Sequence, residues 1–261
     1  MRAEIGIIGG TGVYDPQFLK NSEDIKLHTP YGAPSDSITV GELKGRMIAF
    51  IPRHGRKHTI RPTDVNSRAN IYALKELGVQ WILAPTTVGS LKEEFMPRDV
   101  VFVDQFIDRT TKREQSFYTG AQVCHISVAE PMCPDLRKIL IKIADEMKIN
   151  YHKTGTYVCI EGPRFSTKAE SKMFRGWGAD IVGMTLVPEC VLAREAEICY
   201  ASIATVTDYD VWKDHPVTVD EVVKTMRENL EKVKNIIMKA VLKIPKERTC
   251  KCKGALKDAL V

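Results

Sequence analysis

The sequence predicts an α/β fold in a single domain. Short apolar runs typical of buried strands alternate along the chain with amphipathic stretches of helical period. A length of 261 residues, with 44% hydrophobic and 27% charged residues, is enough to build one large core. No linker rich in Pro, Gly or Ser and no internal repeat divides the sequence. We therefore treat residues 1–261 as one domain, in which residues 243–261 form a C-terminal tail.

Composition argues against several classes of partner. The formal net charge of +5 is modest and the basic residues are scattered, whereas a nucleic-acid surface needs a basic stripe with interleaved aromatics. No apolar run approaches the roughly 18 residues of a bilayer span. The N-terminal MRAEIGIIGG lacks the architecture of a signal peptide. We expect a cytoplasmic protein that binds neither nucleic acid nor membrane, and a small anionic ligand as partner for a few of its cations.

The cysteine pattern predicts neither a disulfide scaffold nor a metal site. Seven cysteines are too few for a scaffold in a chain of this length. The CxC at 250–252 stands alone, and His54 and His58 have no glutamate between them as in HExxH. We therefore expect no metal and no cofactor, and most thiols reduced in the core. The Lys- and Glu-rich composition is compatible with a hyperthermophile, in which intracellular disulfides occur. In that case the CxC is a candidate disulfide tether, with Cys190 in reserve.

The first predicted strand ends in a glycine-rich turn. Ile5–Ile8 is a short apolar run that leads into Gly9-Gly10-Thr11-Gly12. Glycines after a strand allow backbone N–H groups to surround an anion, and Thr11 adds a hydroxyl. The run is neither a P-loop nor a dinucleotide fingerprint. A plain tight turn explains it equally well.

A hairpin is predicted over residues 38–51, with Lys44-Gly45 at its turn. Its second strand leads into Arg53 and His54, beside Gly55. The planar guanidinium of an arginine matches phosphate oxygens in a bidentate manner, so this pair is a candidate oxyanion site. A solvated basic loop is the alternative.

The middle of the chain predicts two helices and two strands. They are a helix over 64–77, a strand over 81–85, a strand over 101–107 and a helix over 135–147 capped by Asp135. The first of these strands leads into Thr86-Thr87-Val88-Gly89-Ser90. Because hydroxyls and a glycine again follow a strand, this segment is a second candidate anion site, like the first glycine-rich turn.

A strand over 157–160 leads into a loop that carries Phe165 and Ser166. Thr167 and Glu170 form a capping box that predicts a helix through Trp177. The flat ring of Phe165 on this loop can stack on a flat ligand, although core packing uses such rings nearly as often.

The stretch 181–210 contains a second group of candidate site residues. A short apolar strand precedes a loop with Thr185, Pro188 opens a helix, and residues 198–206 form a strand buried on both faces. Asp208 and Asp210 follow, and side chains two apart on an extended chain point the same way. Open α/β sheets bind ligands at the carboxyl ends of their strands. A solvated turn is the alternative.

The last predicted element is an amphipathic helix over 219–242, which packs on the sheet or on a neighbour. Polar clusters thus follow five predicted strands of one alternating chain. Together they predict one pocket with a positive, hydroxyl-rich anion end and a doubly acidic end. A nucleotide polyphosphate would require a metal-binding motif, so we interpret the anion end as a site for free phosphate beside a neutral heterocycle.

Eight segments together resemble the S-methyl-5′-thioadenosine phosphorylases of the trimeric purine nucleoside phosphorylase family. They are IGIIGGTGVYD, PRHGRKHTIRPTDVNSRANIYALKELG, QFIDRTT, SFY, AEPMCP, EGPRFSTKAES, GADIVGMTLVPE and CYASIATVTDYD. The match runs from residue 5 to about residue 240. It implies a central mixed, partly barrel-like β-sheet flanked by helices, and a homotrimer or a dimer of trimers. It also implies phosphate-dependent cleavage of methylthioadenosine, and of adenosine, to adenine and a ribose 1-phosphate in salvage.

The resemblance implies a role for each matching residue. Phosphate would be bound by Thr11, Arg53, His54, Thr86, Thr87 and Thr185. The nucleoside would be bound by Met184 at the ribose, by Phe165, Ser166, Asp208 and Asp210 at the base, and by Val219 and Val222 at the 5′ substituent. His125 matches a position that reaches into a neighbouring subunit's site. Relatives often have Asn where this chain has Gly183, and Cys133 and Cys199 match family cysteines that can approach each other.

The same residues imply a mechanism. Phosphate, held in line by Arg53, His54 and the threonine hydroxyls, would attack the anomeric carbon as adenine leaves. Asp208, its pKa raised in a closed apolar site, is the candidate general acid for N7. Asp210 would accept a hydrogen bond from the exocyclic amine, which favours 6-amino over 6-oxo purines.

Three alternatives to this reading remain. A 6-oxopurine nucleoside or methylthioinosine phosphorylase usually pairs an asparagine with the base, and Thr-Asp-Tyr-Asp argues against it. A hydrolase would not need the phosphate site. A non-catalytic purine sensor would not explain an anion site that faces the sugar.

Overall fold

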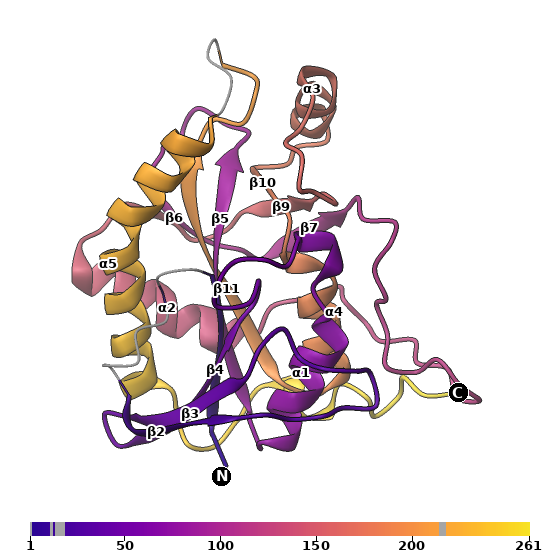
Figure 1. Cartoon of the computed structure of the whole chain (residues 1–261). Helices are drawn as coiled ribbons and strands as arrows, with labels where there is room; N and C mark the ends of the chain where they lie inside the picture. Colours follow the sequence, from indigo (N-terminus) through magenta and orange to yellow (C-terminus); the bar gives the residue numbers. More distant parts are fainter. Residues whose placement is uncertain (1, 11–12, 14–18, 214–217) are drawn as a thin grey trace.

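A large mixed β-sheet flanked by helices forms the body of the chain (Figure 1). The computed structural model describes residues 2–10, 13, 19–213 and 218–261. Its strands are β1 Ile5–Gly9, β2 Lys20–Ile25, β3 Ile38–Leu43, β4 Arg46–Pro52, β5 Trp81–Ser90, β6 Val100–Phe102, β7 Gln105–Asp108, β8 Tyr151–His152, β9 Thr156–Cys159, β10 Ile181–Gly183 and β11 Cys199–Asp208. Its helices are α1 Ser67–Glu76, α2 Pro134–Met147, α3 Lys168–Gly176, α4 Leu186–Glu195 and α5 Val219–Lys243, with short 3₁₀ turns η2 Pro62–Asp64 and η3 Lys251–Gly254.

The sheet branches at β5. The main path runs β2-β3-β4-β1-β5-β10-β9-β7, and β11 pairs with β5 and β6 off this path. β5 is parallel to β1 through its first residues and antiparallel to β10 at its end. β11 is parallel to β5 along almost its whole length. The carboxyl ends of β1, β4, β5 and β11 therefore lie along one edge of the sheet.

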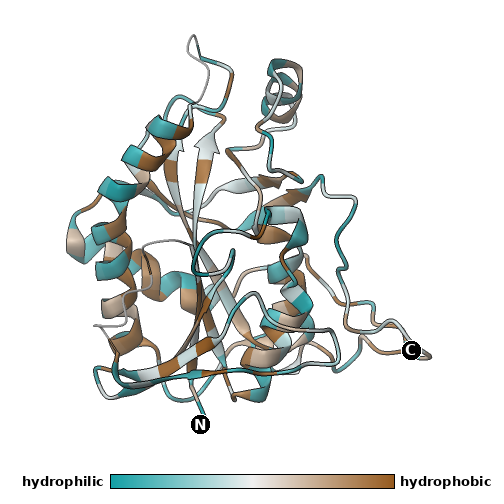
Figure 2. Cartoon of the chain, in the orientation of Figure 1, coloured by the Kyte–Doolittle hydropathy of each residue, from teal (hydrophilic) through white to brown (hydrophobic). Residues whose placement is uncertain are grey.

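Two hydrophobic cores cover the two faces of the sheet. One core contains buried residues of α1 and α4, and the other contains buried residues of α2 and α5. Figure 1 shows α5 and α2 on one side of the strands and α1 and α4 on the other. Hydrophobic and hydrophilic residues alternate around these helices in Figure 2, as one-sided burial requires. In the described part of the chain, no helix combines the length and apolar character that a membrane span needs.

Most predicted elements are confirmed. The hairpin turns at Lys44, α5 covers the predicted helix, and β11 is a strand whose residues are almost all buried. Thr167 and Glu170 form the predicted capping box of α3. Local signals suffice here because each of these elements has its hydrophobic period, its turn residues or its cap within a few residues of sequence.

Four predicted boundaries are wrong. β5 continues to Ser90 because it pairs with β11, so the hydroxyl cluster lies within the strand and not after it. The strand predicted over 101–107 is two strands, since β6 pairs with β11 while β7 pairs with β9. α1 begins only at Ser67, after its cap Asn66. α2 begins at Pro134, so Asp135 lies in its first turn and is not the cap.

The cysteines differ from the sequence interpretation. The CxC of the tail does not lie beside Cys190, which is buried in α4. It lies beside Cys133 and Cys199, and the four sulfur atoms are within 4.8 Å of one another. The expected approach of Cys133 to Cys199 is therefore confirmed. Motif spacing missed the cluster because its members come from three segments that only the fold brings together.

Candidate active site

The predicted polar clusters converge along the edge where the parallel strands end. Gly9 at the end of β1 pairs with Pro52 at the end of β4, and the Arg53 backbone N–H donates to the Gly9 carbonyl at 2.9 Å. On the other side, Gly89 of β5 pairs with Asp208 of β11. Thr11 of the first cluster lies outside the described residues. The site is thus built on adjacent strands of one rigid sheet.

Two hydroxyls meet at the middle of this edge. Thr86 Oγ1 on β5 and Thr185 Oγ1 after β10 are 2.9 Å apart, and both residues are half-buried. Tyr157 Oη accepts from the Thr185 backbone N–H at 3.3 Å. Successive strand residues face opposite sides of a sheet, so the side chain of Thr87 does not join this pair. Thr86 and Thr185 therefore form a convergent pair of donors and acceptors.

Arg53 does not present its guanidinium to a pocket. It is 3% exposed, and its Nε and Nη2 bind the two carboxylate oxygens of Glu189 at 2.8 and 2.9 Å. Its Nη2 also donates to the Ile8 carbonyl at 2.9 Å, and its Nη1 donates to the Pro85 carbonyl at 3.1 Å. The predicted bidentate phosphate contact would require breaking the pair with Glu189. The geometry instead makes Arg53 the link between the ends of β1, β4 and β5 and helix α4.

Glu189 is a buried partner of Arg53 that sequence reasoning missed. It is 1% exposed in α4 and also accepts from Tyr200 Oη at 2.7 Å. Burial by itself would lower the pKa of Arg53, but the charge and hydrogen bonds of Glu189 raise it above its usual value. An acid in the otherwise apolar run LVPECVLA was the available signal, because a buried carboxylate requires a partner.

His54 is a neutral imidazole. Its Nδ1 lies 3.0 Å from the Ile60 carbonyl oxygen, which can only accept, so we assign the proton to Nδ1 and a lone pair to Nε2. Burial, followed by the charge of Arg53, lowers the pKa of His54 to about 4. The predicted positive anion end is therefore wrong in its charge. Arg53 is neutralised by Glu189, His54 is uncharged, and the hydroxyls remain.

The two aspartates do not point the same way along an extended chain. β11 ends at Asp208, and Asp210 has φ of 50°, in the left-handed region. The Asp210 backbone N–H turns back to donate to Asp208 Oδ1 at 2.8 Å, while Thr207 Oγ1 donates to Asp208 Oδ2 at 2.6 Å. Gly89 makes room for this arrangement, since a Cβ there would lie 2.9 Å from Asp208 Oδ1. The turn separates the two carboxylates into a half-buried one and a buried one.

The buried carboxylate lacks a complete set of partners. Asp210 is 5% exposed, and its Oδ2, together with Ser166 Oγ and Ser171 Oγ, has no hydrogen-bonding partner among the described residues. Burial raises the pKa of Asp210, while the Ser171 hydroxyl, the Val211 backbone N–H and the Ser166 hydroxyl act in the opposite direction. Buried polar atoms are normally paired. The two hydroxyls lie next to the Asp210 carboxylate without a well-aligned hydrogen bond to it, so all three atoms are positioned to bind a ligand. Ser171 on α3 had no signal in the sequence.

The hydroxyl pair and the carboxylates are separated by a short stretch of β5. Thr86 and Gly89 are three residues apart on this strand, which corresponds to about 10 Å. This length can hold one pentose between an anion at Thr86 and a base at Asp208 and Asp210. The two ends of the predicted pocket therefore belong to one site.

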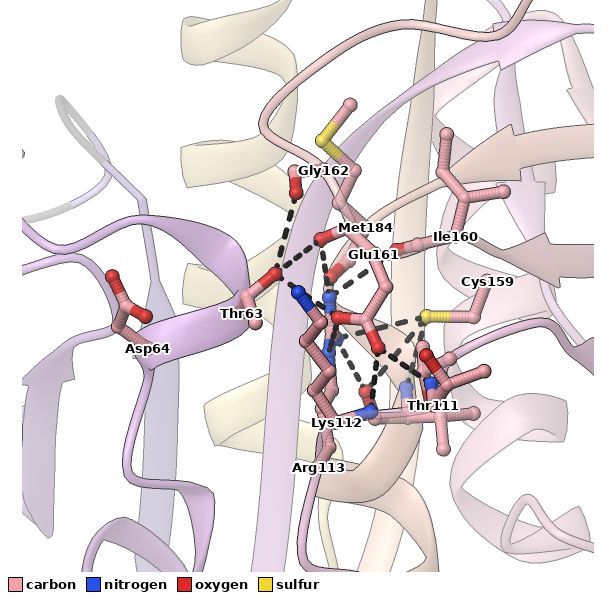
Figure 3. Close-up of polar contacts among 12 residues, drawn as sticks. Thr63, Asp64, Thr111, Lys112, Arg113, Cys159, Ile160, Glu161, Gly162 and Met184 are labelled. Carbon is pink, nitrogen blue, oxygen red and sulfur yellow. Dashed lines mark hydrogen bonds and ion pairs between the residues drawn. The ribbon is translucent and has the colours of Figure 1, made fainter.

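Arg113 fixes the loops that carry Met184 and Thr185 (Figure 3). Its Nη1 donates to the Met184 and Val187 carbonyls at 2.7 and 2.6 Å, and its Nη2 donates to the Glu161 carbonyl at 2.7 Å. The carboxylate of Glu161 in turn accepts from the backbone N–H groups of the segment before Arg113. This arrangement joins three loops into one unit, and nothing in the sequence around Arg113 indicated it.

Gly183 is explained by its neighbour Tyr157. A Cβ at Gly183 would lie 2.1 Å from Tyr157 Oη, so no larger residue fits beside this ring. Tyr157 is fully buried and occupies the space that a side chain at position 183 would otherwise take. Gly183 therefore leaves room for the Tyr157 ring beside Thr185.

The remaining predicted residues are more dispersed. Phe165 is 40% exposed beside Ser166, and Met184 is half-buried beside Thr185. Val219 and Val222, at the start of α5, are exposed and half-buried. His125 is exposed in a segment whose backbone pairs with the C-terminus, which Figure 1 places well away from α3. A single chain therefore does not bring His125 to the other site residues.

Comparisons with known proteins agree with this geometry. A family model described as the phosphorylase superfamily matches residues 4–243. The chain is 58% identical to S-methyl-5′-thioadenosine phosphorylase of Nitrosopumilus maritimus, over 98% of this chain and 97% of that protein. It is 55% identical to the protein of that name from Pyrococcus furiosus, over 99% of both chains.

Solved structures extend the comparison. A methylthioadenosine phosphorylase from an antarctic soil metagenomic library superposes with a TM-score of 0.95 at 46% identity, over 100% of this chain and 93% of that chain. A methylthioadenosine phosphorylase from Schistosoma mansoni in complex with adenine gives 0.92 at 41% identity, over 98% and 96% of the two chains.

Proposed function

This chain belongs to the phosphorylase superfamily, and we propose that it uses inorganic phosphate to cleave the N-glycosidic bond of S-methyl-5′-thioadenosine. The products are adenine and 5-methylthioribose 1-phosphate, which return to purine and methionine salvage. Relatives that carry the name of this activity share 52–58% identity with the chain over essentially its whole length. Adenosine, which shares the base and differs at the 5′ substituent, is the expected second substrate.

The observation that carries the proposal is the orphaned group of Asp210, Ser166 and Ser171 at the end of β11. An ionised carboxylate only accepts hydrogen bonds, and a 6-aminopurine offers it an N–H donor. A 6-oxopurine offers a second acceptor, which would leave both buried groups unpaired at a cost of about 1–3 kcal/mol. This contact supports the choice of an adenine nucleoside over a 6-oxopurine nucleoside.

The phosphate end relies on hydroxyls more than on charge. Thr86 and Thr185 supply two hydroxyls within 2.9 Å of each other, and His54 Nε2 can accept a hydrogen bond from a protonated phosphate oxygen. Arg53 acts as a positioning residue, because its hydrogen bonds hold the strand ends and its charge is balanced by Glu189. Thr11 remains a proposed phosphate contact on the strength of the resemblance. For Thr87 the resemblance conflicts with the alternation of β5, which turns its side chain away from the Thr86 and Thr185 hydroxyls.

These positions define the reaction. A phosphate oxygen held at the hydroxyl pair attacks the anomeric carbon while the bond to adenine N9 breaks, and positioning supplies much of the rate enhancement. Asp208 is the proposed general acid: its carboxylate must first take up a proton, because both oxygens accept hydrogen bonds in the free protein, and that proton then moves to N7 so that the base leaves as neutral adenine. Asp210 accepts from the exocyclic amine, and Phe165 stacks on the ring. The proposal assigns every step to phosphate and to residues of the chain, and it includes no cofactor or metal.

The assembly completes the site. A homotrimer, alone or paired into a hexamer, would place His125 of one subunit beside the site of another, which accounts for its exposed position in a single chain. Val219 and Val222 then line the 5′ pocket with apolar surface suited to a methylthio group. A cytoplasmic enzyme of this kind would meet its substrates as free small molecules.

The test is an assay of methylthioadenosine, adenosine and inosine, each with and without phosphate. We expect adenine release from methylthioadenosine only when phosphate is present, with methylthioribose 1-phosphate as the second product. Release of adenine without phosphate would identify a hydrolase, and faster cleavage of inosine would identify a 6-oxopurine enzyme. Ligand recovered intact after incubation with phosphate would identify a purine-binding protein.

A further inference from the structure

Four cysteines from three distant segments meet at the end of the sheet opposite the candidate active site. Cys133 precedes α2, Cys199 opens β11, and Cys250 and Cys252 belong to the C-terminal tail. Asp208, at the other end of β11, is nine residues from Cys199, or about 30 Å along the strand. The cluster therefore takes no part in the chemistry proposed above.

We propose that the thiolates of Cys133, Cys199, Cys250 and Cys252 together bind one zinc ion as a structural site. Their sulfur atoms all lie within 4.8 Å of one another, and the Cys199 and Cys250 sulfurs are 3.2 Å apart. A tetrahedral site with Zn–S bonds of about 2.3 Å places its sulfurs about 3.8 Å apart. Adjustments of roughly an ångström would bring the four sulfurs to that geometry.

The charge around the cluster suits four bound thiolates. Binding zinc releases four thiol protons and leaves a net charge of −2 on the site. Arg194 Nη1 lies 3.6 Å from Cys252 Sγ, where it can donate a charge-assisted hydrogen bond. Lys251 and Lys253 flank Cys252 within η3. The Arg194 guanidinium offsets part of the negative charge of this buried site.

A metal explains the convergence better than disulfides do. Two disulfides need only two close pairs, of which Cys199 and Cys250 at 3.2 Å are one, whereas a single ion needs all four sulfurs together, and they lie within 4.8 Å of one another. A bond between Cys250 and Cys252 would close a very short loop and constrain the unfolded chain little. One ion joining Cys133, Cys199 and the tail closes loops of about 50 residues or more, where a cross-link constrains the chain most.

The site would anchor the tail. Beyond η3 the chain continues to Val261, whose backbone pairs with Val123, and the Ala259 carbonyl accepts from the His125 backbone N–H. Fixing Cys250 and Cys252 to the core therefore fixes the strand-like contact that holds the 123–125 segment. Within the proposed function, the ion would help to present His125 without touching any substrate.

The experiment measures metal in the full-length chain purified under reducing conditions with zinc in the medium. We expect one zinc per chain by elemental analysis. Replacing zinc with cobalt should give the absorption of tetrahedral thiolate-bound cobalt. Cys252→Ser and the less buried Cys250→Ser should each lose at least tenfold of the zinc affinity and lower the melting temperature. Cys124→Ser, whose thiol lies outside the cluster, should keep both.

Two results would overturn the proposal. One is a metal-free wild-type chain with all seven thiols free and no cobalt–thiolate absorption. The other is a chain that binds no zinc because two or four of its thiols are lost to disulfides. The cobalt spectrum of the wild-type chain decides the question even where a serine variant fails to fold. Phosphorolysis is measured separately, so failure of the metal proposal leaves the proposed function intact.

Discussion

Arg53 and Asp210 are both ionisable residues that the protein buries almost completely, but they differ in how far their side chains are hydrogen-bonded within the protein. Arg53 is 3% exposed, and its guanidinium makes four hydrogen bonds to protein atoms, two of them to Glu189. Asp210 is 5% exposed, and its Oδ2 has no partner among the described residues. The charge at the Arg53 end is fully paired within the protein, whereas the Asp210 end leaves a carboxylate oxygen available to a ligand.

The difference between the two residues distinguishes a structural role from a role in ligand recognition. A buried charge with internal partners ties segments together, here β1, β5 and α4 at the end of β4. A buried acceptor without a partner costs about 1–3 kcal/mol in the free protein, and a ligand that donates to it recovers that cost on binding. We infer that residues of the first kind matter mainly for stability, and that residues of the second kind matter mainly for specificity.

Glu189→Gln should produce the largest change, because it leaves the buried charge of Arg53 without its counter-ion. Removing one partner of a buried pair typically costs about 3–5 kcal/mol in the free energy of unfolding. Denaturant unfolding measures this cost. Replacing both partners, as in Arg53→Met with Glu189→Leu, should restore most of the loss.

Glu195→Gln is the matched control on the same helix. Glu195 is 3% exposed and accepts only from the neutral donors Ser116 Oγ and Phe117 N–H, both at 2.8 Å. Its amide retains an acceptor, so the loss should be much smaller than that for Glu189→Gln. Equal losses for the two variants would show that Arg53 does not depend on its ion pair.

His54 lies next to Arg53 at the fully paired end of the site, and its contribution to the free energy of unfolding should depend on pH. Its folded pKa of about 4 is depressed below the usual 6.5, so its contribution is present above pH 6.5 and is lost as pH falls toward 4. The full effect is roughly 3 kcal/mol. The difference in unfolding free energy between the wild type and His54→Gln should therefore shrink between pH 7 and pH 4.5. A constant difference would mean that the imidazole is not neutral in the fold.

The contacts at the Arg53 end of the site were harder to predict from the sequence than those at the Asp210 end. Apolar runs and strand-end clusters placed Arg53, Thr86 and the aspartates along one edge, because carboxyl ends of parallel strands meet there. The partner of Arg53 lies 136 residues away in sequence, and no local pattern links the two. Arginine in a polar run was therefore interpreted as facing a ligand when it faces a carboxylate.

Rules of local geometry failed where the chain changes conformation. Alternation predicted that Asp208 and Asp210 share a direction, and it fails because Asp210 lies beyond the strand in the left-handed region. Alternation also argues against pointing both Thr86 and Thr87 at one ligand, because β5 extends through both. The cysteine cluster was missed for a third reason, since spacing rules consider one segment at a time.

Asp210→Asn should change specificity while sparing the fold. An amide can turn its N–H toward a 6-oxo group, so the ratio of kcat/KM for methylthioadenosine over its 6-oxo counterpart should fall about 10- to 100-fold, the equivalent of about 1–3 kcal/mol. Burial raises the pKa of Asp210, so this group favours the fold at low pH and that contribution is lost as pH rises through the folded pKa. The free variant should therefore be at least as stable as the wild type at pH 7.

Asp99→Asn tests whether a buried carboxylate that is paired within the protein affects stability and not substrate specificity. Asp99 is 4% exposed, but its Oδ2 already accepts from the Met96 backbone N–H at 3.0 Å and lies 2.9 Å from His152 Nε2. This variant should lose stability and keep the substrate ratio, the reverse of Asp210→Asn. If Asp210→Asn instead destabilises the free protein and leaves the ratio unchanged, its carboxylate has a protein partner, and an orphaned buried acceptor no longer identifies the base site of this enzyme.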